Sequence, residues 1–247
     1  MKEPEIYGDR VELYDRIYHW KDYRSEAEVV HRLLRAHGIE EGARVLEAAC
    51  GTGNYLLELK RWYEVSGFDL NRPSVELARK KLPEVELVVA DMVDFRLENP
   101  VDALVCLFSS IGYVYPDSRL GAAAESFYQN VRPGGVALVE PWFQPEKAIP
   151  GFFSQQTYDG DDMKLCRAAT HQVEGRMSIF DFHWLVTRPE GVEHFVEEHR
   201  LWMYTRKELL GAFEAAGFEV EWNLGGPMPG RGLLVARKPG EAAQSRS

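Results

Sequence analysis

The first apolar pattern along the chain has the period of an α-helix. Between residues 26 and 36, apolar side chains recur every three or four positions, which places Val29, Val30 and Leu33 on one face. A short apolar run, residues 44–48, follows and leads into a glycine-rich turn. The change of period predicts a helix followed by the first strand of a sheet.

Apolar runs and helical patterns continue to alternate as far as Pro141. The predicted strands are residues 44–48, 64–69, 86–90, 102–108 and 136–140, and the predicted helices are residues 26–36, 54–63, 74–82 and 120–131. Such alternation is typical of a doubly wound, mostly parallel α/β sheet. The nearly continuous apolar strands agree with this, because helices cover both faces of such a sheet.

Beyond Pro141 the pattern becomes that of antiparallel strands. Around Phe180, Phe182 and Trp184 the alternation has a period of two, with the aromatic side chains on one face. Strand-like stretches lie within residues 161–173, 176–187 and 192–204. We therefore expect an antiparallel β insertion.

The last part of the chain returns to the earlier pattern. Thr205 and Glu208 form a capping box before an apolar helix that Gly217 ends, and residues 218–223 and 232–237 predict a closing strand pair. The expected organisation is one α/β domain formed by residues 1–143 plus 204–238, the insertion at 144–203, and a disordered polar tail at 239–247.

Composition narrows the class of protein. The 247 residues, 45% of them hydrophobic, suffice for the core of one large domain. A formal net charge of −10 disfavours broad nucleic-acid binding, which needs a basic surface. Three scattered cysteines form neither a disulfide framework nor a zinc site, so we expect no metal.

The chain also lacks the sequence signals of export and membrane insertion. The segment Met1–Arg10 has no apolar stretch typical of a signal peptide, and no apolar run reaches the ~18 residues of a spanning helix. These features predict a cytoplasmic protein with no membrane partner.

The strongest chemical signal follows the first predicted strand, where Gly51 and Gly53 form a G-x-G turn before a helix. Such a turn lets the backbone approach a ligand closely. A dinucleotide fingerprint needs a third small residue at position 56, and Leu56 stands there, which counts against an NAD or FAD oxidoreductase. The turn therefore suits a cofactor without a pyrophosphate.

Three polar or soft side chains follow at the ends of the next two strands. Asp69 can accept hydrogen bonds from both hydroxyls of a ribose. Asp91 can accept from an adenine amino group, and Met92 can pack on the ring. Each feature alone could belong to an ordinary turn or a solvated strand end. Their order along successive strands favours a cofactor site.

The ordered motifs E-A-A-C-G-T-G, F-D-L, A-D-M and R-P-G-G resemble those of class I S-adenosylmethionine (SAM)-dependent methyltransferases. Four more segments are similar to one subfamily, the N,N-dimethyltransferases of dTDP-linked amino sugars that make desosamine and mycaminose precursors. They are Y-D-x-I-Y-x-x-K-D-Y from Tyr14, C-L-F-S-S-I-G-Y from Cys106, V-E-P-W-F from Val139 and G-G-P-x-x-G-R-G-L from Gly225. The resemblance implies a Rossmann-like class I methyltransferase sheet with SAM as cofactor and S-adenosylhomocysteine as product.

The resemblance also implies the residues of the site. The cofactor candidates are Tyr14, Tyr23, Ala49, Gly51, Gly53, Asp69, Leu70, Asp91, Met92 and Phe108. The acceptor candidates are Ser109, Ser110, Tyr113, Trp142, Arg167 and Arg231, with both arginines approaching the diphosphate. Tyr14 and Tyr113 are the catalytic candidates, expected to orient the amine beside the methyl group.

Several of these residues also have a purely structural interpretation. Tyr14 and Tyr23 could pack on the domain surface, and the two arginines could face water. Phe182 and Trp184 are more typical of a core than of a binding wall. The four histidines that lack metal-ligand spacing are interpreted as structural: His171, His183, His194 and His199.

The function implied is methyl transfer from SAM to the amine of a dTDP-linked amino-deoxy sugar. Two alternatives remain open: methylation of another small amine or hydroxyl compound, and SAM binding without catalysis. The expected partner is a small-molecule acceptor, with no nucleic acid and no membrane, and a homodimer is left open.

Overall fold

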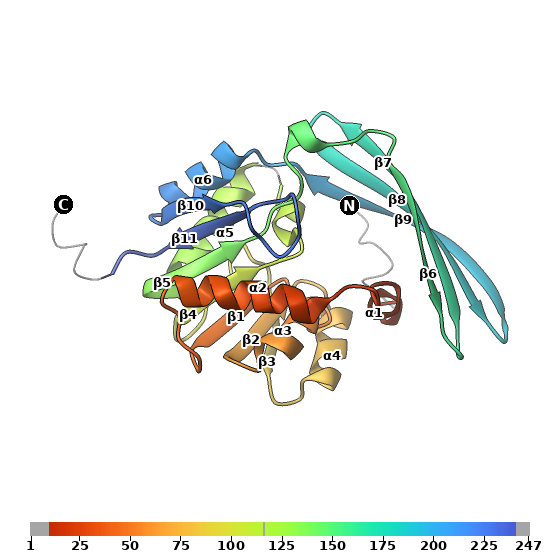
Figure 1. The fold of residues 1–247 in the computed structure, drawn as a ribbon, viewed down its shortest axis with the longest axis horizontal. Helices are drawn as coiled ribbons and strands as arrows, with labels where there is room; N and C mark the ends of the chain where they lie inside the picture. The colour runs from red at the N-terminus through yellow and green to blue at the C-terminus, as the bar shows by residue number, and fades with distance from the viewer. Residues whose placement is uncertain (1–9, 116, 241–247) are drawn as a thin grey trace.

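Two β-sheets organise the chain in the computed structural model, which describes residues 10–115 and 117–240 (Figure 1). The strands of the larger sheet are β1 (Arg44–Ala48), β2 (Glu64–Asp69), β3 (Glu86–Val89), β4 (Val101–Cys106), β5 (Val131–Val139), β10 (Glu219–Asn223) and β11 (Leu233–Arg237). Their order is β10-β11-β5-β4-β1-β2-β3. Only β11 is antiparallel to its neighbours β5 and β10, which confirms the doubly wound, mostly parallel sheet.

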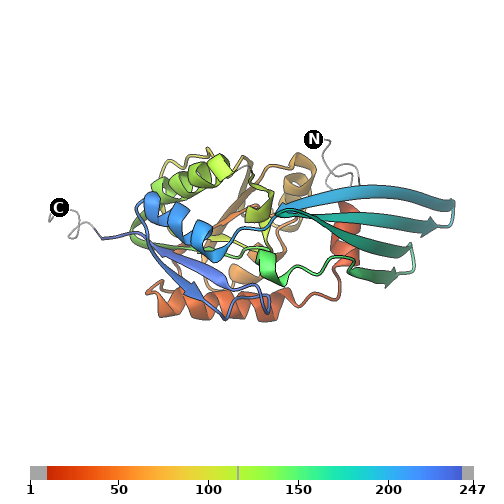
Figure 2. The same ribbon diagram turned by 90° about the horizontal axis from the view of Figure 1, so that it is seen from above.

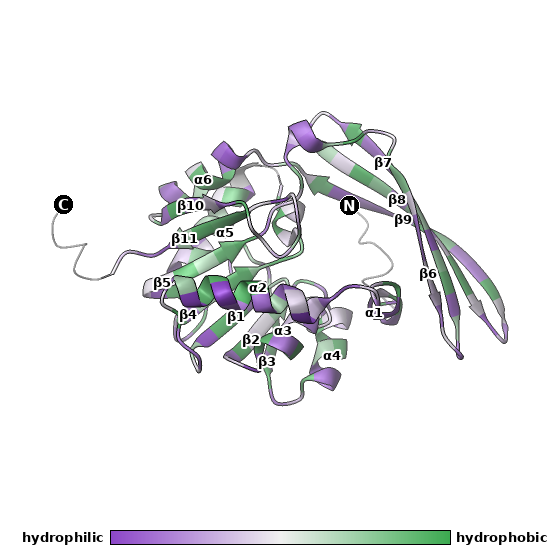
Figure 3. Ribbon diagram, in the orientation of Figure 1, coloured by the Kyte–Doolittle hydropathy of each residue, from purple (hydrophilic) through white to green (hydrophobic). Residues whose placement is uncertain are grey.

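Helices cover both faces of this sheet (Figure 2). The helices of one face are α2 (Tyr23–Ala36), α3 (Asn54–Leu59) and α4 (Arg72–Lys81), and those of the other are α5 (Asp117–Asn130) and α6 (Arg206–Ala215). Alternate residues of β4 face the two layers of helices. Val105 packs with α2 and α3, whereas Leu104 packs with α5 and α6. The central strands β4 and β5 and the neighbouring β11 are correspondingly hydrophobic over most of their length in Figure 3.

Capping residues explain where the helices begin. Asp22 accepts a 2.9 Å hydrogen bond from the Ser25 N–H, so α2 begins three residues before the predicted start. Asn71 caps α4 in the same way, since its side chain accepts a 2.8 Å hydrogen bond from the Ser74 N–H. The capping box of Thr205 and Glu208 is present at the start of α6.

The smaller sheet is antiparallel throughout. Its strands are β6 (Phe153–Asp159), β7 (Lys164–Glu174), β8 (Met177–Arg188) and β9 (Gly191–Trp202), paired in that order. We did not predict β6, because this edge strand is mostly polar and mostly exposed, so it lacks an apolar alternation. The division into a domain and an insertion at 144–203 stays a prediction, and residues 241–247 of the expected tail lie outside the described residues.

Helix α1 (Glu12–Ile17) joins the two sheets. Its apolar side chains Leu13 and Ile17 are fully buried against Trp184 and Phe195 of the smaller sheet. On the opposite side, Asp15 accepts hydrogen bonds from polar groups that flank the glycine turn and from α4: Thr52 Oγ1 at 2.6 Å, Asn54 Nδ2 at 2.9 Å and Lys81 Nζ at 2.8 Å. The helix therefore lies over the carboxyl edge of β1.

Candidate functional site

Three adjoining cavities lie at the carboxyl ends of the parallel strands, and Tyr14 of α1 lines all of them. The first cavity is lined by Ala49, Gly51, Asp69, Leu70, Asp91, Met92 and Arg119. The second is lined by Tyr23, Glu47, Asn54 and Phe108. The third is lined by Trp142, Arg167, Phe182, His199 and Arg231. Tyr113 and Ser110 line both the first and the third cavity.

The turn after β1 has the left-handed backbone that its glycines favour. Gly51 and Gly53 have φ of 54° and 80°, and Ala49 also has a positive φ of 57°. Gly53 lines none of the three cavities. A Cβ there would lie 3.1 Å from Leu82 Cδ1, so this glycine lets α4 approach the turn.

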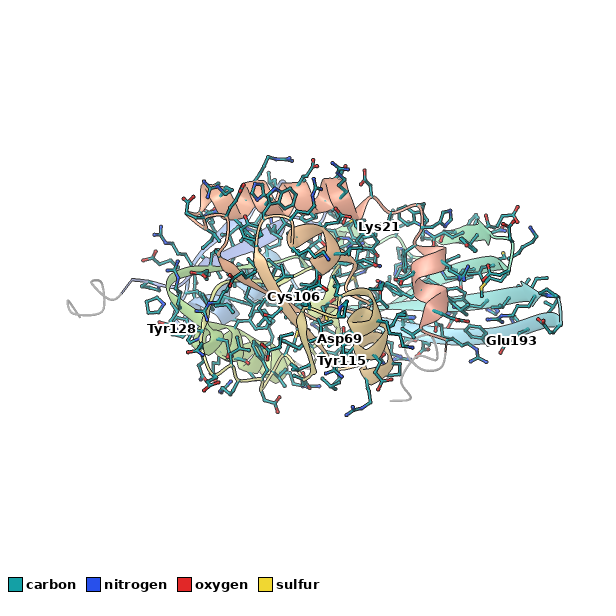
Figure 4. The ribbon with its side chains drawn as sticks, turned by 90° about the horizontal axis from the view of Figure 1, so that it is seen from below. Lys21, Asp69, Cys106, Tyr115, Tyr128 and Glu193 are labelled. Atoms are coloured by element: carbon teal, nitrogen blue, oxygen red, sulfur yellow. The ribbon has the colours of Figure 1, made fainter. Side chains whose placement is uncertain are left out.

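The carboxylate of Asp69 is fixed by the backbone at the end of β2 (Figure 4). Its Oδ2 accepts a hydrogen bond from the Gly51 N–H at 2.8 Å, and its Oδ1 accepts one from the Asn71 N–H at 2.8 Å. Two backbone donors hold the side chain at the wall of the first cavity. The geometry suits a carboxylate that binds vicinal hydroxyls of a ribose.

Asp91 lies on the same edge after β3, with a partner that sequence analysis missed. Its Oδ2 accepts a 2.5 Å hydrogen bond from Arg119 Nη2, and Arg119 also lines the first cavity. Met92 is buried beside it. This end of the cavity thus offers an aspartate, a thioether and a partly exposed guanidinium group.

A buried glutamate lines the second cavity. Glu47 of β1 is 2% exposed, and its Oε2 has no hydrogen-bond partner among the described residues. Burial raises the pKa of Glu47 well above its ordinary value, and the nearby charge of Asp69 acts in the same direction. A cationic group that enters this cavity would be stabilised by the glutamate.

Two buried guanidinium groups line the third cavity. Arg167 of β7 is 7% exposed, lies 4.5 Å from the centre of the Phe182 ring, and donates from Nη1 to Tyr18 Oη at 3.1 Å. Arg231 is 6% exposed and lies 4.6 Å from the centre of the Trp142 ring, and its Nε has no partner among the described residues. Burial lowers the pKa of Arg231, while Glu140 opposes that effect.

The remaining acceptor candidate, Ser109, lies behind the third cavity rather than on its wall. It is 1% exposed, donates to the Pro141 carbonyl at 2.8 Å, and accepts from Arg231 Nη1 at 2.9 Å. The structure therefore places Ser109 in contact with the arginine instead of facing a ligand. Phe182 lines the cavity although we expected it in the core, whereas Trp184 is fully buried as expected.

Sequence reasoning also missed a buried charged network beneath the site. Lys21, in the segment between α1 and α2 (Figure 4), pairs with Glu26 and lies 4.3 Å from the centre of the Phe108 ring. Glu140 is fully buried and lies 3.9 Å from Arg231 Nη1. Both residues stand inside the quoted motifs, K-D-Y and V-E-P-W-F, which was the signal available in the sequence.

Two structural absences hold for residues 10–115 and 117–240. No cluster of three or more His, Cys, Asp or Glu side chains in these ranges could bind a metal ion. Within the same ranges, no helix is both long and apolar enough to cross a membrane.

The chain is similar to known proteins both in sequence and in structure. The family model described as a methyltransferase domain matches residues 45–135. The chain is 37% identical to the dTDP-3-amino-3,6-dideoxy-alpha-D-glucopyranose N,N-dimethyltransferase of Streptomyces fradiae, over 97% of this chain and 94% of the relative. It is 38% identical to the dTDP-3-amino-3,4,6-trideoxy-alpha-D-glucopyranose N,N-dimethyltransferase of Streptomyces venezuelae, over 92% and 97%.

Solved structures agree with these sequence matches. The crystal structure of Streptomyces venezuelae DesVI superposes with a TM-score of 0.87 at 37% identity, over 94% of this chain and 98% of that one. The SAM-bound structure of CalS10, an amino pentose methyltransferase from Micromonospora echinaspora, gives a TM-score of 0.83 at 32% identity, over 96% and 100%.

Proposed function

Because this chain belongs to the methyltransferase family of the dTDP-amino sugar N,N-dimethyltransferases, we propose that it methylates the amine of a nucleotide-linked amino-deoxy sugar. Its cofactor is SAM. The observation that carries the proposal is the shared wall of two cavities. Tyr14 and Tyr113 line both the first and the third cavity, and the third also contains two buried guanidinium groups.

The residues of the first and second cavities fit SAM. The unpaired Oε2 of Glu47 suits the α-ammonium group, which would relieve the buried acid. Asp69 would accept from the ribose hydroxyls, and Asp91 with Met92 would hold the adenine. When bound, SAM supplies a methyl group that is already activated by the positive charge of its sulfur.

The third cavity suits an anionic nucleotide sugar. Arg167 and Arg231 are cations that the fold has removed from water, so a diphosphate would compensate part of their desolvation. The same contacts supply binding energy far from the reacting amine, which is how an acidic protein can hold an acidic substrate. The sugar amine would then lie beside Tyr14 and Tyr113.

The work of the protein is chiefly alignment and exclusion of water. Tyr14 and Tyr113 would orient the amine so that its lone pair is directed at the methyl carbon. Helix α1 and the smaller sheet enclose the third cavity and limit its contact with solvent.

Calorimetric titration of the protein saturated with S-adenosylhomocysteine tests the proposal. TDP is expected to bind in the micromolar range, and Arg231→Ala is expected to abolish that binding. Glu146→Ala, a change in the nearby 3₁₀ helix η3 (Pro145–Lys147), serves as the control. If TDP fails to bind while S-adenosylhomocysteine is still held, the acceptor is another small molecule and the sugar assignment is wrong.

A further inference from the structure

Tyr113 is connected to two buried residues of the smaller sheet. It ends the 3₁₀ helix η2 (Ser110–Tyr113), and its side chain is 38% exposed between the first and third cavities. Its Oη lies 2.7 Å from Nδ1 of His199 on β9. His199 Nε2 in turn lies 3.0 Å from Oε1 of Glu197. The three side chains form a continuous hydrogen-bonded chain along the wall of the third cavity.

The neighbours of Glu197 fix the direction of these hydrogen bonds. An indole N–H can only donate, and Trp184 Nε1 lies 3.1 Å from the same Oε1, so this oxygen acts as an acceptor. His199 Nε2 therefore carries the hydrogen that reaches Glu197. In the neutral ring, Nδ1 then has a lone pair and accepts from the Tyr113 hydroxyl.

Only the tyrosine of this chain is well exposed, although all three side chains line the third cavity. His199 and Glu197 are 5% and 4% exposed, and the Phe182 ring packs 4.9 Å from the imidazole. The charged group that faces this region from β7 is Arg167, which lies over the Phe182 ring. A ligand in the third cavity meets the exposed phenol more readily than the nearly buried imidazole and carboxylate that also line this cavity.

A glycine brings the two elements close enough for the contact. A Cβ built on Gly112 would lie 3.2 Å from Leu201 Cδ2 and 3.5 Å from the Trp202 carbonyl oxygen. The absence of a side chain at this position lets η2 pack directly on β9. Tyr113 is thereby held beside His199 rather than left to rotate in the cavity.

We propose that Tyr113, His199 and Glu197 form a proton relay that deprotonates the acceptor amine before methyl transfer, an inference that rests on the proposed function. An aliphatic amine arrives largely as an ammonium ion near neutral pH and then has no lone pair to attack with. In the relay, an ammonium N–H bond breaks and its proton passes to the Tyr113 oxygen. The phenolic proton passes at the same time to His199 Nδ1.

The outcome of this step is a neutral amine and an imidazolium paired with the Glu197 carboxylate. Tyr113 contacts the substrate and is the catalytic residue, whereas His199 and Glu197 act through it and are positioning residues. After the product leaves as an ammonium ion, the relay returns its proton to solvent through the exposed phenol. No oxidant, metal or further reactant is required.

The tautomer of His199 gives a test that needs no turnover. In cofactor-free protein labelled with ¹⁵N at histidine, the signals of His199 are assigned by their loss in His199→Gln. We expect the ring to carry its proton on Nε2 with Nδ1 unprotonated under basic conditions. A proton on Nδ1 would overturn the proposal, because the phenol could not then donate to that atom.

The pH dependence of kcat/KM gives the second test. Relative to the unsubstituted protein, Tyr113→Phe and His199→Gln are expected to be slower by about 10²-fold near pH 7 and to converge to within about 3-fold once the pH exceeds the pKa of the acceptor amine, where the amine is already neutral. His194→Gln, an exposed histidine of the same strand, should follow the unsubstituted protein throughout. A loss that stays constant across the pH range means that these residues only position the substrate, and the relay is then wrong.

Two controls distinguish failure of the relay from misfolding of a variant and from failure of the proposed function. Circular dichroism checks each variant, and Glu197→Gln, which has nearly the same shape as the native residue, replaces His199→Gln should that variant not fold. If the unsubstituted protein methylates no amino sugar at any pH, the proposed function and the relay both fail. Turnover with parallel pH profiles overturns the relay alone.

Discussion

Glu140 Oε2 accepts a 2.7 Å hydrogen bond from the Phe108 backbone N–H, while its Oε1 accepts one of 2.8 Å from Met228. One buried carboxylate thus joins the end of β4 to the loop between β10 and β11. Phe108 and Ser109 have positive φ values of 52° and 67°, which cost about 1–3 kcal/mol each for residues other than glycine. The carboxylate is the group that holds this strained turn in place.

Glu140→Gln is expected to destabilise the protein by about 1–3 kcal/mol, because an amide cannot accept from both backbone donors. Arg231 also loses the negative charge near it, so the variant should bind TDP more weakly. Urea unfolding and calorimetry measure the two effects. Glu146→Gln, at a surface position, is the control, and equal stability of the two variants would contradict the anchoring role.

The pair of Lys21 and Glu26 should behave as a coupled unit. The Lys21 side chain is fully buried, and burial lowers its pKa while the hydrogen bond that it donates to Glu26 opposes that effect. Lys21→Met leaves a partly buried carboxylate without its cation and should cost about 3 kcal/mol of unfolding free energy. Adding Glu26→Gln should restore part of this loss. A double variant whose loss of unfolding free energy equals or exceeds the sum of the two single losses would contradict the coupling.

Glu47→Gln is expected to affect stability and cofactor binding in opposite directions. Burial raises the pKa of Glu47 in the folded state, so the cofactor-free protein loses stability as pH rises above the ordinary value of 4.5. Removing the charge should therefore stabilise the cofactor-free protein at neutral pH by about 1 kcal/mol or more. Affinity for S-adenosylhomocysteine should fall by about tenfold or more.

Thermal unfolding without cofactor and calorimetry with it measure the two effects of the Glu47 change. Glu64→Gln, an exposed glutamate at the start of β2, should change neither. Unchanged affinity in Glu47→Gln would show that the buried acid does not contact the cofactor's cationic group.

Glu208 makes the free energy of unfolding depend on pH in the acidic range. Its hydrogen bond from Arg176 holds the pKa of Glu208 at about 2, below the ordinary value of 4.5. Since the folded pKa is the lower one, the contribution is present above 4.5 and disappears as pH falls toward about 2. The pair is near the surface, so screening keeps the contribution below about 1 kcal/mol.

The measurement for Glu208 is urea unfolding at a series of pH values. Glu208→Gln should show a flatter dependence between pH 4.5 and about 2 than the unsubstituted protein. Glu214→Gln, an exposed residue of the same helix, should keep the original slope. Identical slopes in all three proteins would contradict the assignment.

The cofactor candidates that line the first and second cavities could be predicted from the sequence, because a residue at the carboxyl end of a parallel strand must lie at one edge of the sheet. Asp69 is the last residue of β2 and Asp91 lies two residues after β3, and the ends of such parallel strands meet at one edge. All cofactor candidates except Gly53 line the first or second cavity. Their roles as ligands of the cofactor stay predictions, as do the cytoplasmic location and the homodimer.

The acceptor side could be predicted only in part, because it depends on contacts between distant elements. A period of two shows which residues of β8 and β9 share a face, but not which element covers that face. Tyr113 and His199 are 86 residues apart, and the approach of η2 to β9 leaves no signal beyond Gly112. His199 was accordingly interpreted as structural. Ser109 was expected to face the acceptor, but it lies behind the wall of the third cavity in contact with Arg231.

Helix α1 has a thermodynamic consequence for the order and strength of ligand binding. The helix packs its apolar face on the smaller sheet and is tied through Asp15 to the loop after β1, so it forms a wall common to both ligands. On the proposed function, we expect whichever ligand binds first to restrict this wall and to spare the second ligand the entropy of ordering it. The cooperativity is reciprocal: the factor by which the acceptor tightens cofactor binding equals the factor by which the cofactor tightens acceptor binding. An enzyme built this way retains its two substrates together better than it retains either one alone.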